Sequence, residues 1–532
     1  MRHMRHDRRS RTVVAIAVAV GLLAASCSSD LDSGVRAGES SAITSSSAPP
    51  VTATPPDDAP ATSVPPSTEP DEPDVSTTTP PDDGGSGTPG GAGSPDGIGD
   101  PLYPDLGNPG VDVEDYLVEL AFDPDGGTLT GSVTMRIAFT EDRDEFTLDS
   151  VGIETTSVSV DGAPADFEID DPELRINPPS PVDRGDTAEV RVDYAVTPGQ
   201  TDFSAGIPAG WFNTPLGSWV LNQPDGARLW LPSNDHPSDK ATWTFRITVP
   251  SGSSAVANGR LVGTTSTPAG DTWEWREDEP MPTYLVLLAT GDYEVVESTT
   301  PDGLPLVNVA LADDLDRVRP FFDGIAAQID FFDDLFGPYP LDRYGLAIID
   351  SIPGLAMETQ GRSFFSRADM RSFDGYLEQL LLAHEIAHQW FGNAVSPASW
   401  DDIWLNESFA TYAQWLWLEH LGFTTVADEA EFARETRAQL GGPPTGDPTV
   451  DELFGYNSYD GGAVVLHALR LTVGDEAFFE VLRRWVVENE GTSRTTDDFV
   501  ALAEEVSGST LDAFLATWLF ASDLPETFPV PA

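Results

Sequence analysis

Cysteine is almost absent from the sequence: its 532 residues include one, Cys27. A single cysteine cannot form a disulfide framework within the chain, and it excludes a metal site built from several thiolates. Basic residues are also scarce, with 28 Lys plus Arg against 88 Asp plus Glu and a formal net charge of -60. So acidic a chain repels phosphate groups, which excludes nucleic acid as an expected partner. We interpret the charge as a solvated acidic surface.

The N-terminus has the pattern of an export signal. Residues 1–11 are basic and residues 12–25 are apolar, a run that is short for a membrane span and typical of a secretory signal. The run ends in Leu-Ala-Ala-Ser-Cys at 23–27, which resembles the lipobox of bacterial lipoproteins. We therefore expect a lipoprotein signal peptide over 1–27, lipidation at Cys27, and an extracytoplasmic protein anchored to the membrane of the cell envelope. The alternative is an ordinary signal peptide and a secreted protein.

Three regions of different composition follow the signal. Residues 28–108 are rich in Ser, Thr, Pro, Gly and Asp, and we expect a disordered tether. Residues 109–298 contain short β-branched and aromatic runs such as YLVELAF and ATWTFRITV, separated by turn residues, which predicts an antiparallel β-sandwich domain. In residues 299–532 the apolar period becomes helical, which predicts an α-rich domain. The fold class is therefore α+β with several domains.

A metal-binding motif lies in one of these predicted helices. His384, Glu385 and His388 form the pattern His-Glu-x-x-His. Residues four apart lie on one face of a helix, so both imidazoles can bind one Zn²⁺, while Glu385 can reach a water molecule at the metal. A catalytic zinc needs a third protein ligand, and Glu407 at the start of the next predicted helix is the candidate.

The stretch HEIAHQWFGNAVSPASWDDIWLNESFATY, residues 384–412, strongly resembles the gluzincin aminopeptidases of peptidase family M1. The resemblance implies one Zn²⁺ per chain, held by His384, His388 and Glu407, with Glu385 as the general base. It covers residues 110–532 and implies a saddle-like β domain followed by a thermolysin-like catalytic domain. Few residues remain after that domain, so we expect no C-terminal helical domain and a more open cleft.

The resemblance extends to residues that contact substrate. GLAMET at 354–359 is similar to the family's GAMEN segment, in which Glu358 would bind the free α-amine and Ala356 and Met357 would line the cleft. Leu355 and Thr359 depart from that pattern. Gln223, in the segment QPDGAR, corresponds to a glutamine that lines the cleft.

A tyrosine segment lies downstream, at 456–463. Its similarity to the family places the hydroxyl that stabilises the transition state on Tyr459, with Gly461 in the position of the usual lysine; Tyr456 is a nearby alternative. His236 is interpreted as a turn residue, because the set of zinc ligands is already complete.

The resemblance therefore implies a zinc metalloaminopeptidase that hydrolyses the first peptide bond of peptides with a free N-terminus. Two alternatives stay open. One is a zinc endopeptidase, or a hydrolase of another substrate, that uses the same site. The other is an inactive surface-binding lipoprotein.

Overall fold

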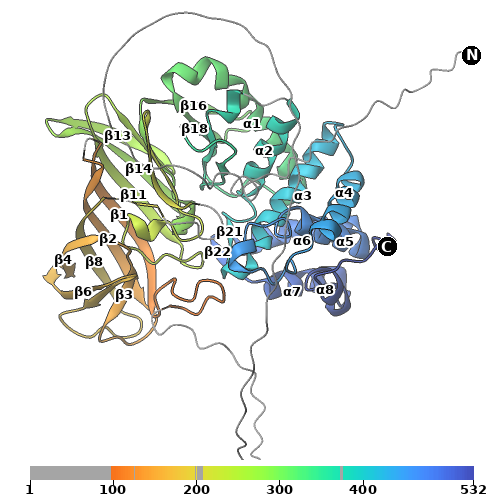
Figure 1. Cartoon of the computed structure of the whole chain (residues 1–532), viewed down its shortest axis with the longest axis horizontal. Helices are drawn as coiled ribbons and strands as arrows, with labels where there is room; N and C mark the ends of the chain where they lie inside the picture. The colour runs from red at the N-terminus through yellow and green to blue at the C-terminus, as the bar shows by residue number, and fades with distance from the viewer. Residues whose placement is uncertain (1–96, 125, 198, 201–207, 372–374, 532) are drawn as a thin grey trace, which may run out of the picture. The chain divides into compact units, whose positions relative to one another are not determined.

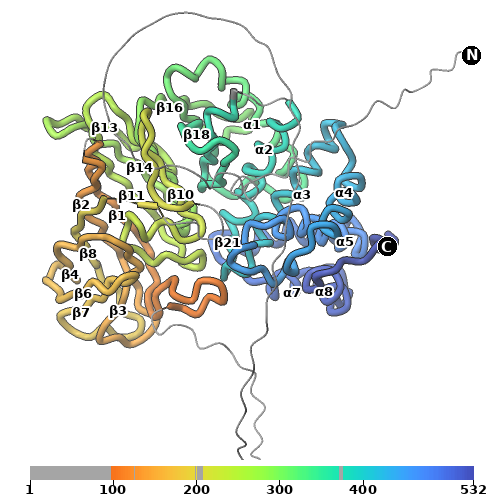
Figure 2. The backbone as a smooth tube through the Cα atoms, viewed as in Figure 1, coloured from red at the N-terminus to blue at the C-terminus, as the bar shows by residue number. Residues whose placement is uncertain are grey.

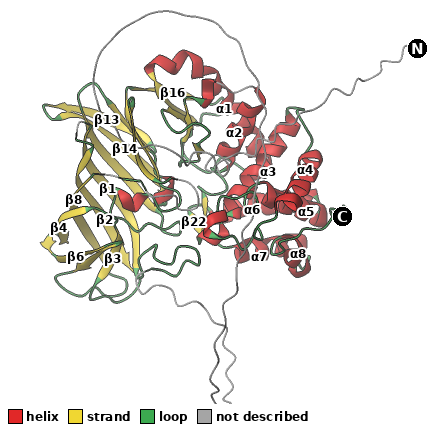
Figure 3. Ribbon diagram, in the orientation of Figure 1, coloured by secondary structure: helices red, strands yellow, loops and turns green. Residues whose placement is uncertain are grey.

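The computed structural model describes residues 97–531 except 125, 198, 201–207 and 372–374, and all of them belong to one compact unit. Strands fill the first half of this region and helices most of the second half (Figures 1 and 3). The predicted signal peptide with Cys27, and residues 28–96 of the predicted tether, lie outside the described residues. No helix among the described residues is long and apolar enough to cross a membrane.

Residues 97–108, predicted to end the tether, are part of the folded protein. Tyr103 and Leu106 are buried, and the Asp100 carboxylate accepts hydrogen bonds from the main-chain amides of Tyr103 and Trp400, both at 2.8 Å. The predicted boundary at 108 is therefore wrong. The polar composition gave no sign of this packing, because only a few side chains of the segment are buried, among them Asp100, Tyr103, Leu106 and Asn108.

Three sheets form the β-rich half. Their strand orders are β13-β14-β11-β1-β2-β8-β4-β5, β12-β15-β10-β9 and β3-β7-β6. The bounds are β1 Val111–Asp123, β2 Thr128–Phe139, β3 Phe146–Asp149, β4 Glu154–Val160, β5 Ala163–Pro164, β6 Asp166–Asp170, β7 Glu173–Asn177, β8 Thr187–Val196, β9 Gly210–Thr214, β10 Gly217–Leu221, β11 Ala241–Val249, β12 Ser254–Ala257, β13 Arg260–Thr267, β14 Gly270–Met281 and β15 Leu288–Gly291. The predicted β-rich domain is confirmed, but β1 and β11 pair in parallel, so a purely antiparallel domain was wrong.

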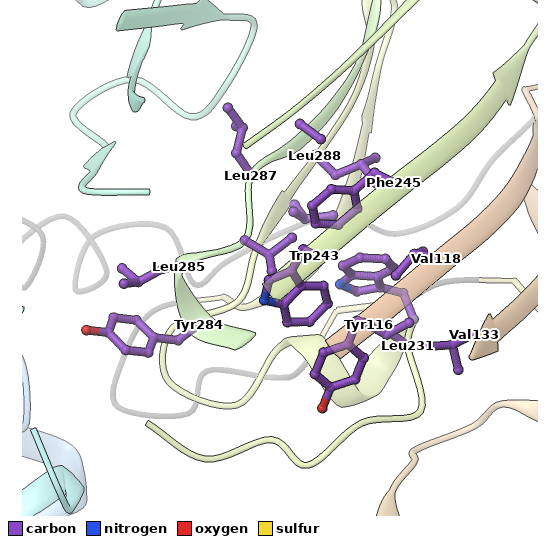
Figure 4. Packing of buried hydrophobic residues seen from close by; sticks show 14 of the residues in the cluster. Tyr116, Val118, Val133, Leu231, Trp243, Phe245, Tyr284, Leu285, Leu287 and Leu288 are labelled. Carbon is purple, nitrogen blue, oxygen red and sulfur yellow. The ribbon is translucent and has the colours of Figure 1, made fainter. Parts of the chain in front are cut away.

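The core of this half follows from the alternation of its strands. In β11 every second residue is buried, which turns Trp243 and Phe245 toward the same face. The Trp243 ring stacks on that of Tyr116 with centroids 4.0 Å apart (Figure 4). Trp219 of the four-stranded sheet belongs to the same buried cluster, so the two larger sheets share one core.

A five-stranded mixed sheet, in the order β16-β17-β18-β20-β19, begins the second half. Its strands are β16 Tyr293–Thr299, β17 Pro305–Leu311, β18 Leu346–Ile349, β19 Ala356–Met357 and β20 Ser363–Ser366, and a further pair is β21 Val395–Pro397 with β22 Thr492–Arg494. The boundary predicted between 298 and 299 falls inside β16 and is therefore misplaced.

The strand β18 shows how this sheet joins the two halves. Leu346 and Ile348 pack into the helical core, whereas Ala347 and Ile349 pack into the core of the β-rich half. Both faces are thus buried, which explains why the strand is continuously apolar.

Helices complete the second half, and the colour gradient in Figure 2 follows the chain into them from the sheet. The α-helices are α1 Leu315–Phe336, α2 Gly375–Ala387, α3 Trp404–His420, α4 Val426–Leu440, α5 Asp460–Val473, α6 Asp475–Asn489, α7 Thr496–Ser507 and α8 Asp512–Trp518. Short 3₁₀ helices occur at η1 Ala227–Leu229, η2 Thr283–Leu285, η3 Ala312–Asp314, η4 Asp369–Arg371, η5 Trp400–Asp402 and η6 Val450–Glu452. The predicted α-rich domain is confirmed.

Candidate metal centre and active site

Helices α2 and α3 pack against each other (Figure 1). This packing brings the three predicted metal ligands together. His384 lies in the last turn of α2, His388 directly follows that helix, and Glu407 lies in the first turn of α3. The Nε2 atoms of the two histidines are 3.1 Å apart, and Oε2 of Glu407 is 3.4 Å from each. All three side chains are buried.

This donor set fits a zinc ion. Ligand atoms at about 2.0–2.1 Å from a tetrahedral centre lie about 3.3 Å apart, close to the three separations above. Two imidazole nitrogens and one carboxylate oxygen are also the ligand types of a catalytic zinc, which keeps its fourth position for water or substrate.

Two acceptors orient the imidazoles. Nδ1 of His388 lies 3.1 Å from the main-chain oxygen of Phe391, and Nδ1 of His384 lies 3.1 Å from Oε1 of Gln414. Each Nδ1 therefore carries the proton, which leaves Nε2 free for a metal. The sequence analysis missed Gln414, although it lies two turns after Glu407 on the same face of α3.

The electrostatics of the site favour a cation. Burial alone would lower the pKa of His388, but the carboxylates of Glu358 and Glu407 outweigh burial and raise it to about 10. Burial would raise the pKa of Glu407, yet the two histidines bring it down to about 2. Glu385 lines the same cavity as Glu358, His388 and Glu407. Three carboxylates thus surround a buried site that a divalent cation would neutralise.

Glu385 lies beside the three predicted metal ligands. Ligand atoms of Glu358, Glu385 and His388 lie within 4.8 Å of one another, and Oε2 of Glu385 has no hydrogen-bond partner in the described part of the chain. Burial raises the pKa of Glu385 well above its usual range, and the neighbouring carboxylates add to this effect.

The structure distinguishes the two candidate tyrosines. The Tyr459 ring lies 5.9 Å from that of His384, nearly parallel at 18°, and lines the cavity. Burial and the nearby carboxylates raise the pKa of Tyr459 well above its usual range, so its phenol stays protonated and can donate a hydrogen bond. The Tyr456 hydroxyl instead donates to the main-chain oxygen of Ala433, and Tyr456 does not line the cavity.

The predicted site residues line one cavity, which is partly open to solvent. Its lining includes every site residue predicted in the folded region: Gln223, Ala356, Met357, Glu358, His384, Glu385, His388, Glu407 and Tyr459. Apolar side chains, Leu221, Leu355, Phe365 and Leu381, line the rest together with Gly354 and Asp369. Nε2 of Gln223 donates to Oε1 of Glu358 at 3.1 Å, so the β-rich half contributes directly to the site.

His236 lies away from the cavity. It is buried in the β-rich half, with Nδ1 2.7 Å from Oγ of Ser238 and Nε2 3.2 Å from Oδ2 of Asp100. The interpretation as a residue outside the metal site agrees with this position.

The main chain of Glu358 is held by two residues that the sequence analysis did not single out. The side-chain amides of Gln389 and Asn393 donate to its carbonyl oxygen at 3.2 Å and 2.6 Å. Both follow His388 closely, and both are fully buried. Thr359, a departure from the expected pattern, is also buried and donates from its hydroxyl to the main-chain oxygen of Arg362.

Family models match both halves of the chain. The Peptidase M1 N-terminal domain matches residues 113–285, and the Peptidase family M1 domain matches residues 322–518. The second match contains the three predicted metal ligands.

Among curated proteins, the chain is similar to Aminopeptidase M1-C of Oryza sativa subsp. japonica, with 30% identity over 55% of this chain and 35% of that protein. It is also similar to Probable aminopeptidase 1 of Sulfurisphaera tokodaii, with 27% identity over 73% of this chain and 51% of that protein. The chain thus spans about a third to a half of the length of these relatives.

Solved structures cover more of the chain. The M1 zinc metallopeptidase from Deinococcus radiodurans is 31% identical, with a TM-score of 0.73, over 82% of this chain and 100% of its own. A two-domain M1 zinc metallopeptidase with bound L-arginine reaches a TM-score of 0.75 at 31% identity, with the same coverage. These matches and the geometry agree: the chain belongs to peptidase family M1.

Proposed function

We propose that this protein is a zinc metalloaminopeptidase that removes the first residue from peptides with a free N-terminus. The observation that carries the proposal is the position of Glu358. Its carboxylate lies within 4.8 Å of ligand atoms of His388 and Glu385, yet it stands outside the set formed by His384, His388 and Glu407. A buried carboxylate beside a metal centre that already has three ligands can receive the cationic amine of a substrate.

His384, His388 and Glu407 would hold the zinc ion. When bound, zinc supplies Lewis-acid chemistry, which polarises the scissile carbonyl and makes water more acidic. Glu385 takes a proton from the attacking water on its carboxylate and delivers it to the nitrogen of the leaving amine. The phenol of Tyr459 donates a hydrogen bond to the carbonyl oxygen as negative charge develops there.

The amine site sets where the peptide is cut. Glu358 binds the α-ammonium group and Gln223 orients its carboxylate, so only the first peptide bond of the substrate reaches the metal. Leu355, Met357 and Phe365 give the pocket beside β19 an apolar wall for the first side chain. Leu355 and Thr359 depart from the family pattern, but the carboxylate of Glu358, on which this geometry depends, is retained.

The test compares the purified wild-type chain with Glu385→Gln and Glu358→Ala. Zinc content is measured first, followed by cleavage of aminoacyl anilides and of the same compounds with an acetylated amine. We expect one zinc per chain in all three proteins. The wild type should cleave free-amine substrates only, and Glu385→Gln should show no turnover. Equal cleavage of acetylated substrates would instead establish an endopeptidase, and zinc without turnover in the wild type would establish a binding protein.

We also propose that the enzyme is held at the outer face of a membrane by a lipid on Cys27. The support is the sequence pattern at 1–27 alone. Expression of the full chain and of Cys27→Ala with a radiolabelled fatty acid tests it. Label and membrane association in the wild type alone support the anchor, and a soluble, unlabelled wild type contradicts it. The expected lack of a C-terminal helical domain stays a prediction.

A further inference from the structure

The backbone of Tyr459 has an unusual conformation. Its φ and ψ are −97° and −101°, and it stands directly before α5, whose first turn receives no side-chain cap. Hydrogen bonds from neighbouring elements hold the segment that carries the phenol. On one side, Oγ of Ser408, the residue after Glu407, donates to the main-chain oxygen of Ser458 at 2.7 Å. This contact joins the segment to α3.

On the other side the segment is held by Arg437 of α4. One terminal guanidinium nitrogen of Arg437 donates to the main-chain oxygen of Gly461 at 3.0 Å and to Oγ1 of Thr445 at 2.8 Å. The Thr445 hydroxyl in turn donates to the main-chain oxygen of Asn457 at 2.9 Å. Arg437 thus holds the chain two residues after Tyr459 directly and two residues before it through one hydroxyl.

The burial of Arg437 is costly. Only 1% of the residue is exposed, and no carboxylate among the described residues pairs with it; its second terminal nitrogen donates to the main-chain oxygen of Ala521 at 3.2 Å. Burial lowers its pKa to about 10, so the group remains charged at neutral pH. A buried cation held only by neutral acceptors loses favourable hydration, and a hydrophobic side chain of similar volume would avoid that loss.

Two glycines make this arrangement possible. A Cβ atom at Gly461 would lie 3.2 Å from Cδ of Arg437 and 2.8 Å from Oδ1 of Asn457. A Cβ atom at Gly462 would lie 1.7 Å from Oγ of Ser408. The glycine that replaces the lysine expected at 461 therefore leaves the space that the Arg437 side chain uses.

We propose that Arg437 is a positioning residue for Tyr459. Its guanidinium fixes the main chain on both sides of the tyrosine and so keeps the phenol beside His384. The proposal rests on the role of Tyr459 in the proposed function.

The test uses the zinc-loaded full chain and four variants: Arg437→Met, Arg437→Lys, Tyr459→Phe and the double variant Arg437→Met/Tyr459→Phe. Displacement of a catalytic group by about 1 Å can reduce turnover about 100-fold. We expect Arg437→Met to reduce kcat about 10- to 100-fold, with KM and zinc content unchanged. Arg437→Lys should recover part of the loss. Arg434→Met, on the same helix, is the matched control and should behave as the wild type, since Arg434 pairs with Glu431 away from the tyrosine segment.

The double variant separates positioning from general damage. If Arg437 acts through Tyr459, Arg437→Met should change kcat less than about 3-fold once the phenol hydroxyl is gone. An equal loss in both backgrounds overturns the proposal, as does unchanged kcat in Arg437→Met. If Arg437→Met does not fold, as judged by near-ultraviolet circular dichroism, Arg437→Lys is tested in both backgrounds under the same criteria. Wild-type activity of Tyr459→Phe would instead refute the role assigned to Tyr459 under the proposed function, whatever Arg437 does.

Discussion

The side-chain amide of Asn393 donates a hydrogen bond to the main-chain oxygen of Glu358, with a donor–acceptor distance of 2.6 Å. The main-chain amide of Asn393 donates to the main-chain oxygen of His388 at 3.0 Å. One residue therefore connects the carboxylate proposed to bind the substrate amine with a proposed metal ligand. In the proposed function, the spacing between these two groups determines which peptide bond reaches the metal.

We expect Asn393→Ala to weaken recognition of the free amine. Loss of the buried donor leaves the Glu358 carbonyl with Gln389 alone, and losing one such hydrogen bond costs about 1–3 kcal/mol. KM for free-amine anilides should rise about 10-fold while zinc content stays at one per chain. Asn489→Ala is the control, because Asn489 also donates to a main-chain oxygen, that of Trp485, at 2.8 Å. An unchanged KM in Asn393→Ala would contradict this role.

Gln414 should affect the metal and not the substrate. Its Oε1 accepts from Nδ1 of His384, and loss of such an outer partner typically lowers metal affinity about 10- to 100-fold. We expect Gln414→Leu to release zinc at a correspondingly lower chelator concentration, and Gln414→Glu, which keeps an acceptor, to retain it. Equal zinc affinity in the wild type and Gln414→Leu would show that this contact does not orient His384.

Asp100 should stabilise the folded state above pH 4. Burial would raise its pKa, but hydrogen bonds from His236 and from the main-chain amides of Trp400 and Tyr103 lower it to about 2. Since the folded-state pKa lies below the unfolded value, the stabilisation is present at neutral pH and is lost as the pH falls toward 2. Asp100→Asn should cost about 2 kcal/mol at pH 7. Denaturant unfolding from pH 7 to 2.5 should show the difference from wild type shrinking; a difference independent of pH would contradict the prediction.

Asp239 should have the opposite pH dependence. Burial raises its pKa to about 8, so the folded state binds this proton more tightly than the unfolded chain does. Its contribution to stability is present below pH 4 and is lost as the pH rises through 8. The thermal midpoint of the wild type should fall between pH 5.5 and 8.5, and the midpoint of Asp239→Asn should fall by less over the same range. Asp166→Asn on the exposed strand β6 removes the same charge and should follow the wild type.

The sequence was sufficient for the parts of the site that depend on helical spacing. His384, Glu385 and His388 span about one turn at the end of α2, so their mutual arrangement follows from helical geometry. The need for a third zinc ligand indicated Glu407, and the family resemblance added Glu358 and Tyr459; the fold brings all three to one cavity. Local spacing could not distinguish Tyr459 from Tyr456, because that difference depends on where α4 packs.

No sequence pattern predicted the hydrogen bonds that support the site. Asn393 and Arg437 both donate to main-chain oxygens, and any residue can provide that acceptor. Their partners lie 35 and 24 positions away, so no periodic pattern connects donor and acceptor. The parallel pairing of β1 with β11 was missed for the same reason: an apolar strand does not encode the direction of its neighbour.

The five-stranded sheet has a consequence for unfolding. Ala347 and Ile349 complete one apolar cluster while Leu346 and Ile348 complete the other, so neither cluster can be exposed to water without dismantling a strand on which the other depends. The β-rich half and the helical half should therefore unfold together. Calorimetry should record one endotherm, with equal calorimetric and van't Hoff enthalpies, for both halves of the folded chain.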